Sequence, residues 1–177
     1  MKRILLIDDE PSILKALKRS LRIPSCELET FDSPDEALKA LDRQTYTLII
    51  SDYRMPEMDG VSLLKIAKQK QPDAVRVILS GYTDVSGLLA AINEAEIYRF
   101  IAKPWDDLEL SMTIGKTLEY ADLLETNRRL LSHIREQEQM IAKQQGELER
   151  LERDSPGITR VRRSDDGYIL LDESDLG

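Results

Sequence analysis

Five short apolar runs alternate with helical patterns as far as about residue 120, and this alternation constrains the fold more than any other feature. The runs occupy residues 4–7, 26–31, 47–51, 75–79 and 98–101. Between them, apolar residues recur three and four positions apart, which is typical of helices with one buried face. We therefore expect an α/β domain whose parallel sheet is covered by helices on both faces.

One helix start is marked especially clearly. Ser33 is placed as an N-cap, Pro34 follows at the first helical position, and Glu36 stands three residues after the serine. This spacing predicts a helix beginning at Pro34 with a capping box between Ser33 and Glu36.

The overall charge and the cysteine content narrow the class of protein. The 177 residues carry 33 acidic and 25 basic side chains, a formal net charge of −8, which argues against nucleic acid as a partner. No stretch approaches the roughly 18 apolar residues of a membrane span, and the first apolar run is too short for a secretory signal. Cys26 is the single cysteine and is expected to be a buried structural thiol. We expect a cytoplasmic protein without a membrane partner.

The sequence changes character after Trp105 and predicts one long helix. Residues 106–153 contain no proline, and a heptad register fits residues 121–153 in continuation of the preceding helix. One core position holds Asn127, Ile134, Ile141 and Leu148, and the other holds Leu123, Leu130, Gln137, Gln144 and Leu151. Isoleucine and leucine at these positions favour a parallel dimeric coiled coil. The alternative is a solvated helix packed on its own domain.

The tail, residues 154–177, follows a Ser-Pro-Gly sequence that ends the helix. Two short β-prone runs surround an Asp-Asp-Gly turn, which predicts a hairpin. A lone hairpin is marginal in water, so the tail either docks or stays disordered. Its cluster of Arg160, Arg162 and Arg163 forms a solvated hairpin edge or contacts an acidic partner or nucleic acid.

Polar side chains stand where the expected strands end. Asp8 and Asp9 follow the first run, and Asp52, Ser80 and Lys103 follow the third, fourth and fifth. Because the carboxyl ends of parallel strands meet at one edge, these groups should converge there. Clustered carboxylates need a cation to remain ionised, and either the lysine or Mg²⁺, which prefers oxygen ligands, can supply it. A carboxylate placed in this way can accept a phosphoryl group. An ordinary salt-bridge cluster is the alternative, and the convergence of all these residues argues against it.

These residues and their neighbours resemble the receiver domain of bacterial two-component response regulators over residues 1–120. The matching motifs are Asp8-Asp9, Asp52 with Met55-Pro56 and Asp59-Gly60, Ser80-Gly81, and Lys103-Pro104. The resemblance implies a flavodoxin-like sheet in the order 2-1-3-4-5. It also implies that Asp52 accepts a phosphoryl group from a sensor histidine kinase or phosphotransfer protein.

The resemblance assigns further roles at this edge. Mg²⁺ would be bound directly by Asp9 and Asp52, through water by Asp8, and by the backbone carbonyl of Arg54. Lys103 would contact the phosphoryl group, with a cis peptide bond to Pro104, and Gly60 would be structural. Ser80 would move towards the phosphate and Phe100 would rotate in response, so that both act as the switch.

The output is less constrained by the sequence. Trp105 after Lys103-Pro104 resembles the receivers of hydrogenase-type regulators and of some cyclic-dinucleotide phosphodiesterases, and the remaining residues are too few for such output domains. We expect a signalling protein, not an enzyme, whose coiled coil engages an unidentified protein partner. A DNA-binding regulator using the tail and a phosphatase-type regulator of a kinase are the alternatives. His133, the single histidine, is expected to be a solvated residue flanking the heptad core.

Overall fold

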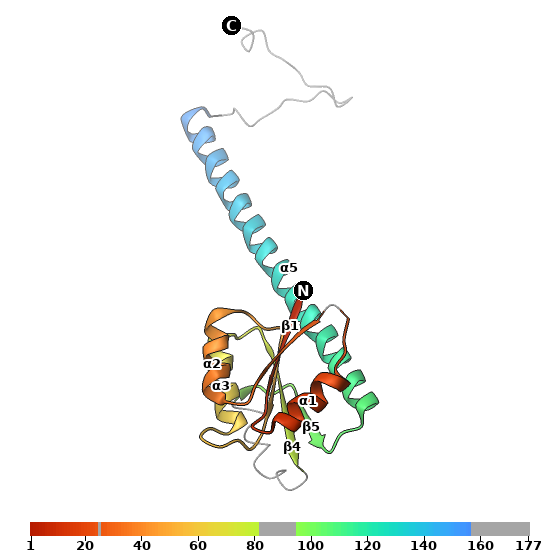
Figure 1. Cartoon of the computed structure of the whole chain (residues 1–177). Coiled ribbons are helices and arrows are strands. Elements are labelled where there is room, and N and C mark those ends of the chain that lie inside the picture. Colours follow the sequence, from red (N-terminus) through yellow and green to blue (C-terminus); the bar gives the residue numbers. More distant parts are fainter. Residues whose placement is uncertain (25, 82–94, 157–177) are drawn as a thin grey trace. The chain divides into compact units, whose positions relative to one another are not determined.

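The computed structural model describes residues 1–24, 26–81 and 95–156 (Figure 1). The helix expected between the fourth and fifth strands falls mainly in residues 82–94, and the hairpin expected in the tail falls in residues 157–177. Both predictions therefore lie outside the described residues. The chain divides into two compact units, Met1–Asn127 and Arg128–Gly177.

All five expected strands form one parallel sheet. They are β1 (Lys2–Ile7), β2 (Cys26–Phe31), β3 (Leu48–Asp52), β4 (Val75–Gly81) and β5 (Arg99–Lys103), and they lie in the order β2-β1-β3-β4-β5. The flavodoxin-like prediction is confirmed. The strands β3, β4 and β5 extend past their apolar runs because the backbone ladder continues into the residues that follow, and β1 begins two residues before its run, at Lys2.

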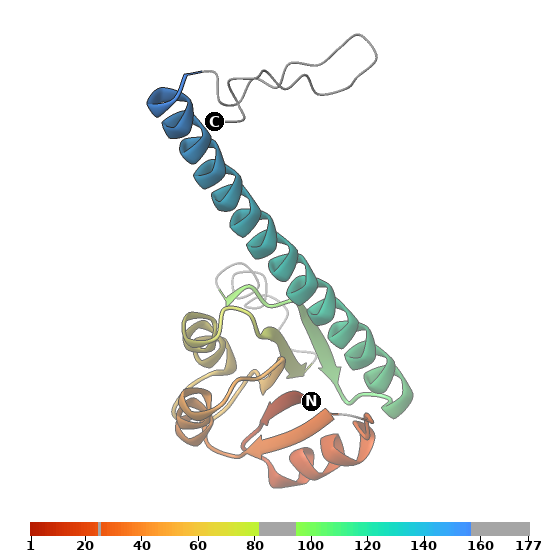
Figure 2. The ribbon, with the colours of Figure 1, turned by 90° about the horizontal axis from the view of Figure 1, so that it is seen from above.

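Helices cover both faces of this sheet. They are α1 (Pro11–Ser20), α2 (Pro34–Arg43), α3 (Gly60–Lys70) and α5 (Asp107–Asp154). The helices α2 and α3 pack on one face, and α1 packs on the other with the first turns of α5 (Figure 2).

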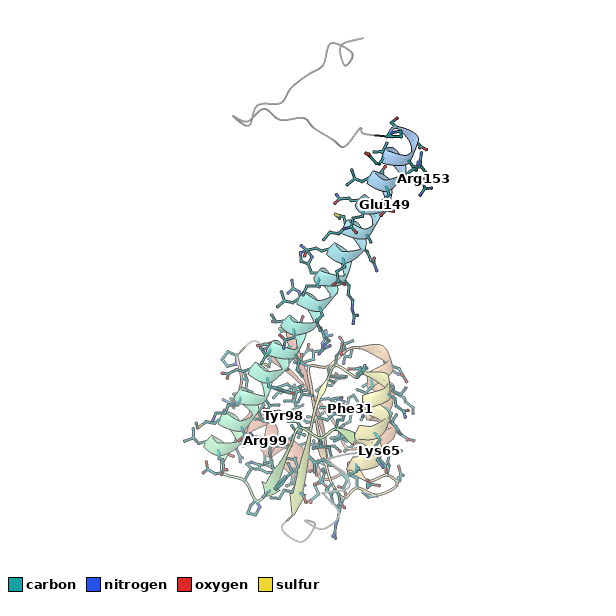
Figure 3. The ribbon with its side chains drawn as sticks, turned by 180° about the vertical axis from the view of Figure 1, so that it is seen from behind. Phe31, Lys65, Tyr98, Arg99, Glu149 and Arg153 are labelled. Atoms are coloured by element: carbon teal, nitrogen blue, oxygen red, sulfur yellow. The ribbon has the colours of Figure 1, made fainter. Side chains whose placement is uncertain are left out.

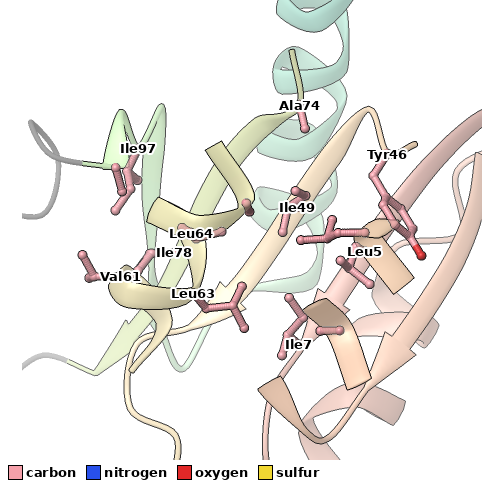
Figure 4. Packing of buried hydrophobic residues seen from close by; sticks show 14 of the residues in the cluster. Leu5, Ile7, Tyr46, Ile49, Val61, Leu63, Leu64, Ala74, Ile78 and Ile97 are labelled. Atoms are coloured by element: carbon pink, nitrogen blue, oxygen red, sulfur yellow. The ribbon is translucent and has the colours of Figure 1, made fainter. Parts of the chain in front are cut away.

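The core consists of two apolar layers, one on each face. Successive side chains of a strand point to opposite faces, so Leu5 and Ile7 enter the layer under α2 and α3, together with Leu64 (Figure 4). Ile4 and Leu6 enter the other layer. These four side chains of β1 are all fully buried, which explains why the run 4–7 is apolar without alternation.

The helix starts follow the sequence signals only in part. The helix α2 begins at Pro34 with Ser33 as the N-cap residue, as predicted, but the Ser33 side chain makes no cap hydrogen bond. The capping-box prediction is therefore wrong; Asp35 and Glu36 in the first turn already stabilise the positive end of the helix by charge. In α3 the cap is made by Asp59, whose carboxylate accepts from the Ser62 amide at 2.9 Å.

The long helix α5 changes its environment along its length. It has buried side chains only as far as Ala121. Leu124 is partly buried against the core, whereas the other large apolar side chains that follow are exposed: Leu123, Leu130, Leu131, Ile134, Met140, Ile141, Leu148 and Leu151. No helix in the described ranges is long and apolar enough to cross a membrane.

Candidate functional site

The residues singled out at the strand ends meet at one edge of the sheet. Asp52 is the last residue of β3, Lys103 is the last residue of β5, and Asp8 directly follows β1. Ser80 is the next-to-last residue of β4 and pairs with Ala102 of β5. We call the group Asp8, Asp52, Ser80 and Lys103 the rim.

Lys103 joins two of the carboxylates. Its Nζ lies 2.7 Å from Asp8 Oδ2 and also pairs with Asp52 Oδ1. Asp8 is fully buried and Asp52 is 7% exposed, so both carboxylates have largely lost water as a partner. One ammonium therefore faces two carboxylates, and the three ionised groups together keep one negative charge.

Backbone amides hold the second oxygen of each carboxylate. The Arg54 amide donates to Asp52 Oδ2 at 2.8 Å, and the Glu10 amide donates to Asp8 Oδ1 at 3.0 Å. These two donors were missing from the sequence prediction. They are Asx-turn contacts, in which an aspartate accepts from the amide two residues later, so an aspartate at a strand end followed by a loop was the available signal.

Burial and pairing shift two of the rim pKa values. Burial raises the pKa of Asp8 above 3.8, because the hydrogen bond from Lys103 compensates only part of the lost hydration. Burial alone would lower the pKa of Lys103, but its hydrogen bonds to Asp52 and Asp8 outweigh that effect and the pKa is raised above 10.5. Lys103 is therefore charged throughout the physiological range.

Gly60 places the loop after Asp52. A Cβ on Gly60 would lie 1.8 Å from the backbone carbonyl oxygen of Asp52, so no other residue fits without moving the strand end. The Gly60 amide also donates to the Tyr53 carbonyl at 3.0 Å. The first residue of α3 thus lies directly against the end of β3.

Of the two residues expected to switch, Ser80 belongs to the rim and Phe100 stands three residues before Lys103 on β5. The Ser80 hydroxyl donates to the Gly81 carbonyl at 3.1 Å. Phe100, on β5, is 51% exposed and lines a hollow of about 280 Å³ together with Trp105 and Thr113. The Lys103–Pro104 peptide bond is cis.

The donor chemistry of the rim suits a hard cation, although the side chains are not grouped around one. Asp8 and Asp52 supply buried carboxylate oxygens, and the half-buried Asp9 directly follows Asp8. Carboxylate oxygens are ligands that Mg²⁺ prefers. In the part of the chain that the structure describes, no three acidic, histidine or cysteine side chains are placed to hold a metal ion. Lys103 lies between Asp8 and Asp52 and neutralises part of their charge.

The sequence matches a known family over most of the folded unit. Residues 4–114 match the response regulator receiver domain family. The chain therefore belongs to this family and carries the receiver domain of a two-component response regulator.

Among curated relatives, the chain is similar to the hydrogenase transcriptional regulatory protein HoxA of Cupriavidus necator. The two are 34% identical over 193 residues, which cover 98% of this chain and 40% of the relative. The chain thus spans less than half of that protein's length. The expected likeness to hydrogenase-type regulators agrees with this relative. The expectation that argues against nucleic acid as a partner is not supported, because HoxA is named a transcriptional regulatory protein.

Solved structures show the same fold at similar identity. A protein described as uncharacterized from Neptuniibacter caesariensis is 41% identical with a TM-score of 0.67, covering 71% of this chain and 93% of that one. The signal receiver domain of an HD domain-containing protein from Pseudomonas fluorescens Pf-5 is 36% identical with a TM-score of 0.65. That match covers 68% of this chain and 97% of the other.

Proposed function

We propose that this chain is a phosphoacceptor response regulator in which Asp52 accepts a phosphoryl group from a sensor histidine kinase or phosphotransfer protein. The observation that carries the proposal is the Lys103 ammonium held between Asp8 and Asp52 at the carboxyl end of the sheet. In a receiver domain, this arrangement presents one carboxylate with a fixed positive charge beside it. The protein's own chemistry is limited to gaining and losing this phosphoryl group.

The proposed transfer uses the fixed orientation of Asp52. An Asp52 oxygen attacks phosphorus, the P–N bond of phosphohistidine breaks, and its electron pair returns to the imidazole. Lys103 neutralises charge on the phosphoryl oxygens. Water later attacks phosphorus and releases inorganic phosphate, which restores the carboxylate.

Mg²⁺ is the proposed cofactor, and it would neutralise charge on the transferring group. Asp9 and Asp52 would bind it directly, Asp8 would bind it through water, and the Arg54 carbonyl would complete the protein ligands. The buried Asp8 carboxylate with its raised pKa supports this ligand set, because a divalent cation relieves the desolvation that disfavours its charge.

The proposed output passes through the fifth strand and helix. The Ser80 hydroxyl would move to bind a phosphoryl oxygen, and Phe100 would turn towards the space that the hydroxyl leaves. The added charge at Asp52 would thus change the preferred packing of Phe100. We propose residues 1–120 as the receiver, 121–153 as a parallel dimeric coil that engages a protein partner, and 154–177 as the tail. The exposed apolar side chains of α5 support a second copy as the cover of that helix.

Treatment with acetyl phosphate and Mg²⁺ tests the phosphoacceptor. Intact-mass spectrometry should show one added phosphoryl group on the wild-type chain and none on Asp52→Asn. Asp59→Asn is the matched control, because Asp59 is an exposed cap residue of α3, and it should be modified like the wild type. Equal modification of wild type and Asp52→Asn would exclude Asp52 as the acceptor.

A second candidate function is DNA binding as part of a transcriptional regulator. The name of HoxA favours it, whereas the net charge of −8 opposes binding by this chain itself. We expect no binding of random duplex DNA in fluorescence anisotropy at low salt. Binding that falls steeply with added salt would favour the second candidate.

A further inference from the structure

Arg76 is a charged side chain inside a buried strand. It is the second residue of β4 and only 5% exposed, where a guanidinium without partners is strongly disfavoured. Its Nε donates to the Ala95 carbonyl at 2.8 Å and its Nη1 to the Ala74 carbonyl at 2.7 Å. Its Nη2 lies 3.5 Å from the Glu96 carboxylate. All three nitrogens therefore have partners.

The partners of Arg76 include the segment that leads into β5, residues 95–98. The Arg76 carbonyl accepts from the Tyr98 amide at 2.9 Å, so both the backbone and the side chain of Arg76 hold this segment. Glu96 has a φ of 48°, a left-handed conformation that a non-glycine residue adopts at a cost and keeps only when its surroundings fix it. Lys68 of α3 also pairs with Glu96 at 2.6 Å.

The same segment is in contact with α5. The Tyr98 ring stacks on the Tyr120 ring of α5 with centroids 4.3 Å apart and an interplanar angle of 13°. Tyr98 and Arg99 lie beside α5 in Figure 3. Phe100 stands two residues after Tyr98, so the two side chains lie on the same side of the extended chain. Arg76 therefore fixes a segment that continues into the strand of Phe100 and that also contacts α5.

Arg76 lies at the end of the sheet opposite the rim. In the strand register it pairs with Ile49, whereas Asp52 pairs with Leu79. Its described partners lie in residues 72–74 and 95–98, away from Asp52 and Lys103. Two strands lead from Arg76 and its partners to the rim: β4, which carries Ser80, and β5, which ends at Lys103.

We infer that Arg76 is a positioning residue for the switch, because it anchors the start of β5 to β4. With this anchor in place, a change at Ser80 alters the positions of Phe100 and α5. Without it, the same change would be absorbed by a displacement of β5. With the amino end of β5 fixed, the two strands can change relative to each other only at the rim end. This inference rests on the proposed function.

Trp105 provides the readout. It is the single tryptophan and lines the same hollow as Phe100, so its fluorescence should report a turn of the Phe100 ring. In the full chain, acetyl phosphate with Mg²⁺ should change the Trp105 emission of the wild type. Arg76→Lys keeps the charge but cannot reach all the partners of the guanidinium fork. It should take up the same phosphoryl mass while its emission change falls about fivefold or more.

Controls separate positioning from folding and from failure of the proposed function. Circular dichroism establishes that each variant is folded, and Arg3→Lys, at an exposed ion pair with Glu27, should respond like the wild type. If Arg76→Lys does not fold, Glu96→Gln removes one exposed partner of Arg76 and is judged by the same criteria. If a folded, phosphorylated variant shows the full emission change of the wild type, the inference is overturned and the proposed function stands. The same holds if the wild type is phosphorylated without any change in Trp105 emission. Absence of phosphorylation in the wild type overturns the proposed function and the inference with it.

Discussion

At the scale of single residues, the rim is a balance between burial and pairing. Lys103 gains from both carboxylates, and its pKa is raised despite burial. Its contribution to stability is therefore complete at neutral pH and is lost only as the pH rises through that raised value. Asp8 is different, because burial outweighs its hydrogen bonds.

Asp8 should make the folded protein less stable as the pH rises above 3.8. Its folded pKa is raised, so the folded state holds the proton more tightly than the unfolded state, and the free energy of unfolding falls as the pH rises through the folded value. We expect Asp8→Asn to raise the free energy of unfolding at pH 7 by about 1 kcal/mol. Urea unfolding without metal at pH 4 and pH 7 measures this. A variant less stable than the wild type at pH 7 would contradict the burial argument.

Gly60 should tolerate no side chain. Gly60→Ala places a methyl group 1.8 Å from the Asp52 carbonyl oxygen, so we expect a loss of about 3 kcal/mol or more in the free energy of unfolding. Gly115→Ala is the control in the same unit, because its Cβ meets nothing within 4 Å and helix propensity predicts a gain of about 1 kcal/mol. Urea titrations of both variants are compared with wild type. Equal effects of the two substitutions would show that the close approach is unimportant.

At the scale of elements, we expect α5 to form a dimer through its exposed apolar side chains. Ile134 and Ile141 fall on the heptad core and are about half exposed, so a second copy should bury them. Replacing both with aspartate should weaken the dimer about 100-fold or more, since each isoleucine contributes about 1.5–3 kcal/mol when buried. Sedimentation of the variant at several concentrations measures the change.

Matched charges on the opposite side of α5 test the specificity of this effect. Ser132→Asp with Gln139→Asp adds the same charge at heptad positions remote from the core, and the dimer should survive. A chain ending near Tyr120 should be monomeric. An oligomer unchanged by truncation would place the interface on the receiver itself.

The sequence predicts the elements more reliably than their termini and contacts. Wholly apolar runs such as residues 4–7 identify buried strands because both faces of the sheet are covered. Ser33 has a capping signal, but its side chain makes no cap hydrogen bond. The acidic side chains in the first turn of α2 can stabilise the start of the helix in its place. The amides of Glu10 and Arg54 were missed because a backbone amide is common to every residue except proline, and only the aspartate two positions earlier signals the contact.

At the scale of the molecule, parallel topology explains how much of the site was predictable. Once the strands are parallel, their carboxyl ends share an edge, so Asp8, Asp52 and Lys103 can be assigned together from residues far apart in the sequence. The role inferred for Arg76 was not predicted, although an arginine in the apolar run at 75–79 was a visible signal. Two of its partners, the Ala95 carbonyl and the Glu96 carboxylate, are about 20 residues away in the sequence, and the fold brings them close.

The most direct test of the account is to locate the phosphoryl group. The chain is treated with acetyl phosphate and Mg²⁺ and then reduced with borohydride, which converts an aspartyl phosphate to homoserine. Peptide sequencing by mass spectrometry reads the position. If Asp52 is the phosphoacceptor, homoserine should appear at position 52, with unmodified aspartate at positions 8, 9 and 59. Homoserine at another position, with Asp52 intact, would contradict it.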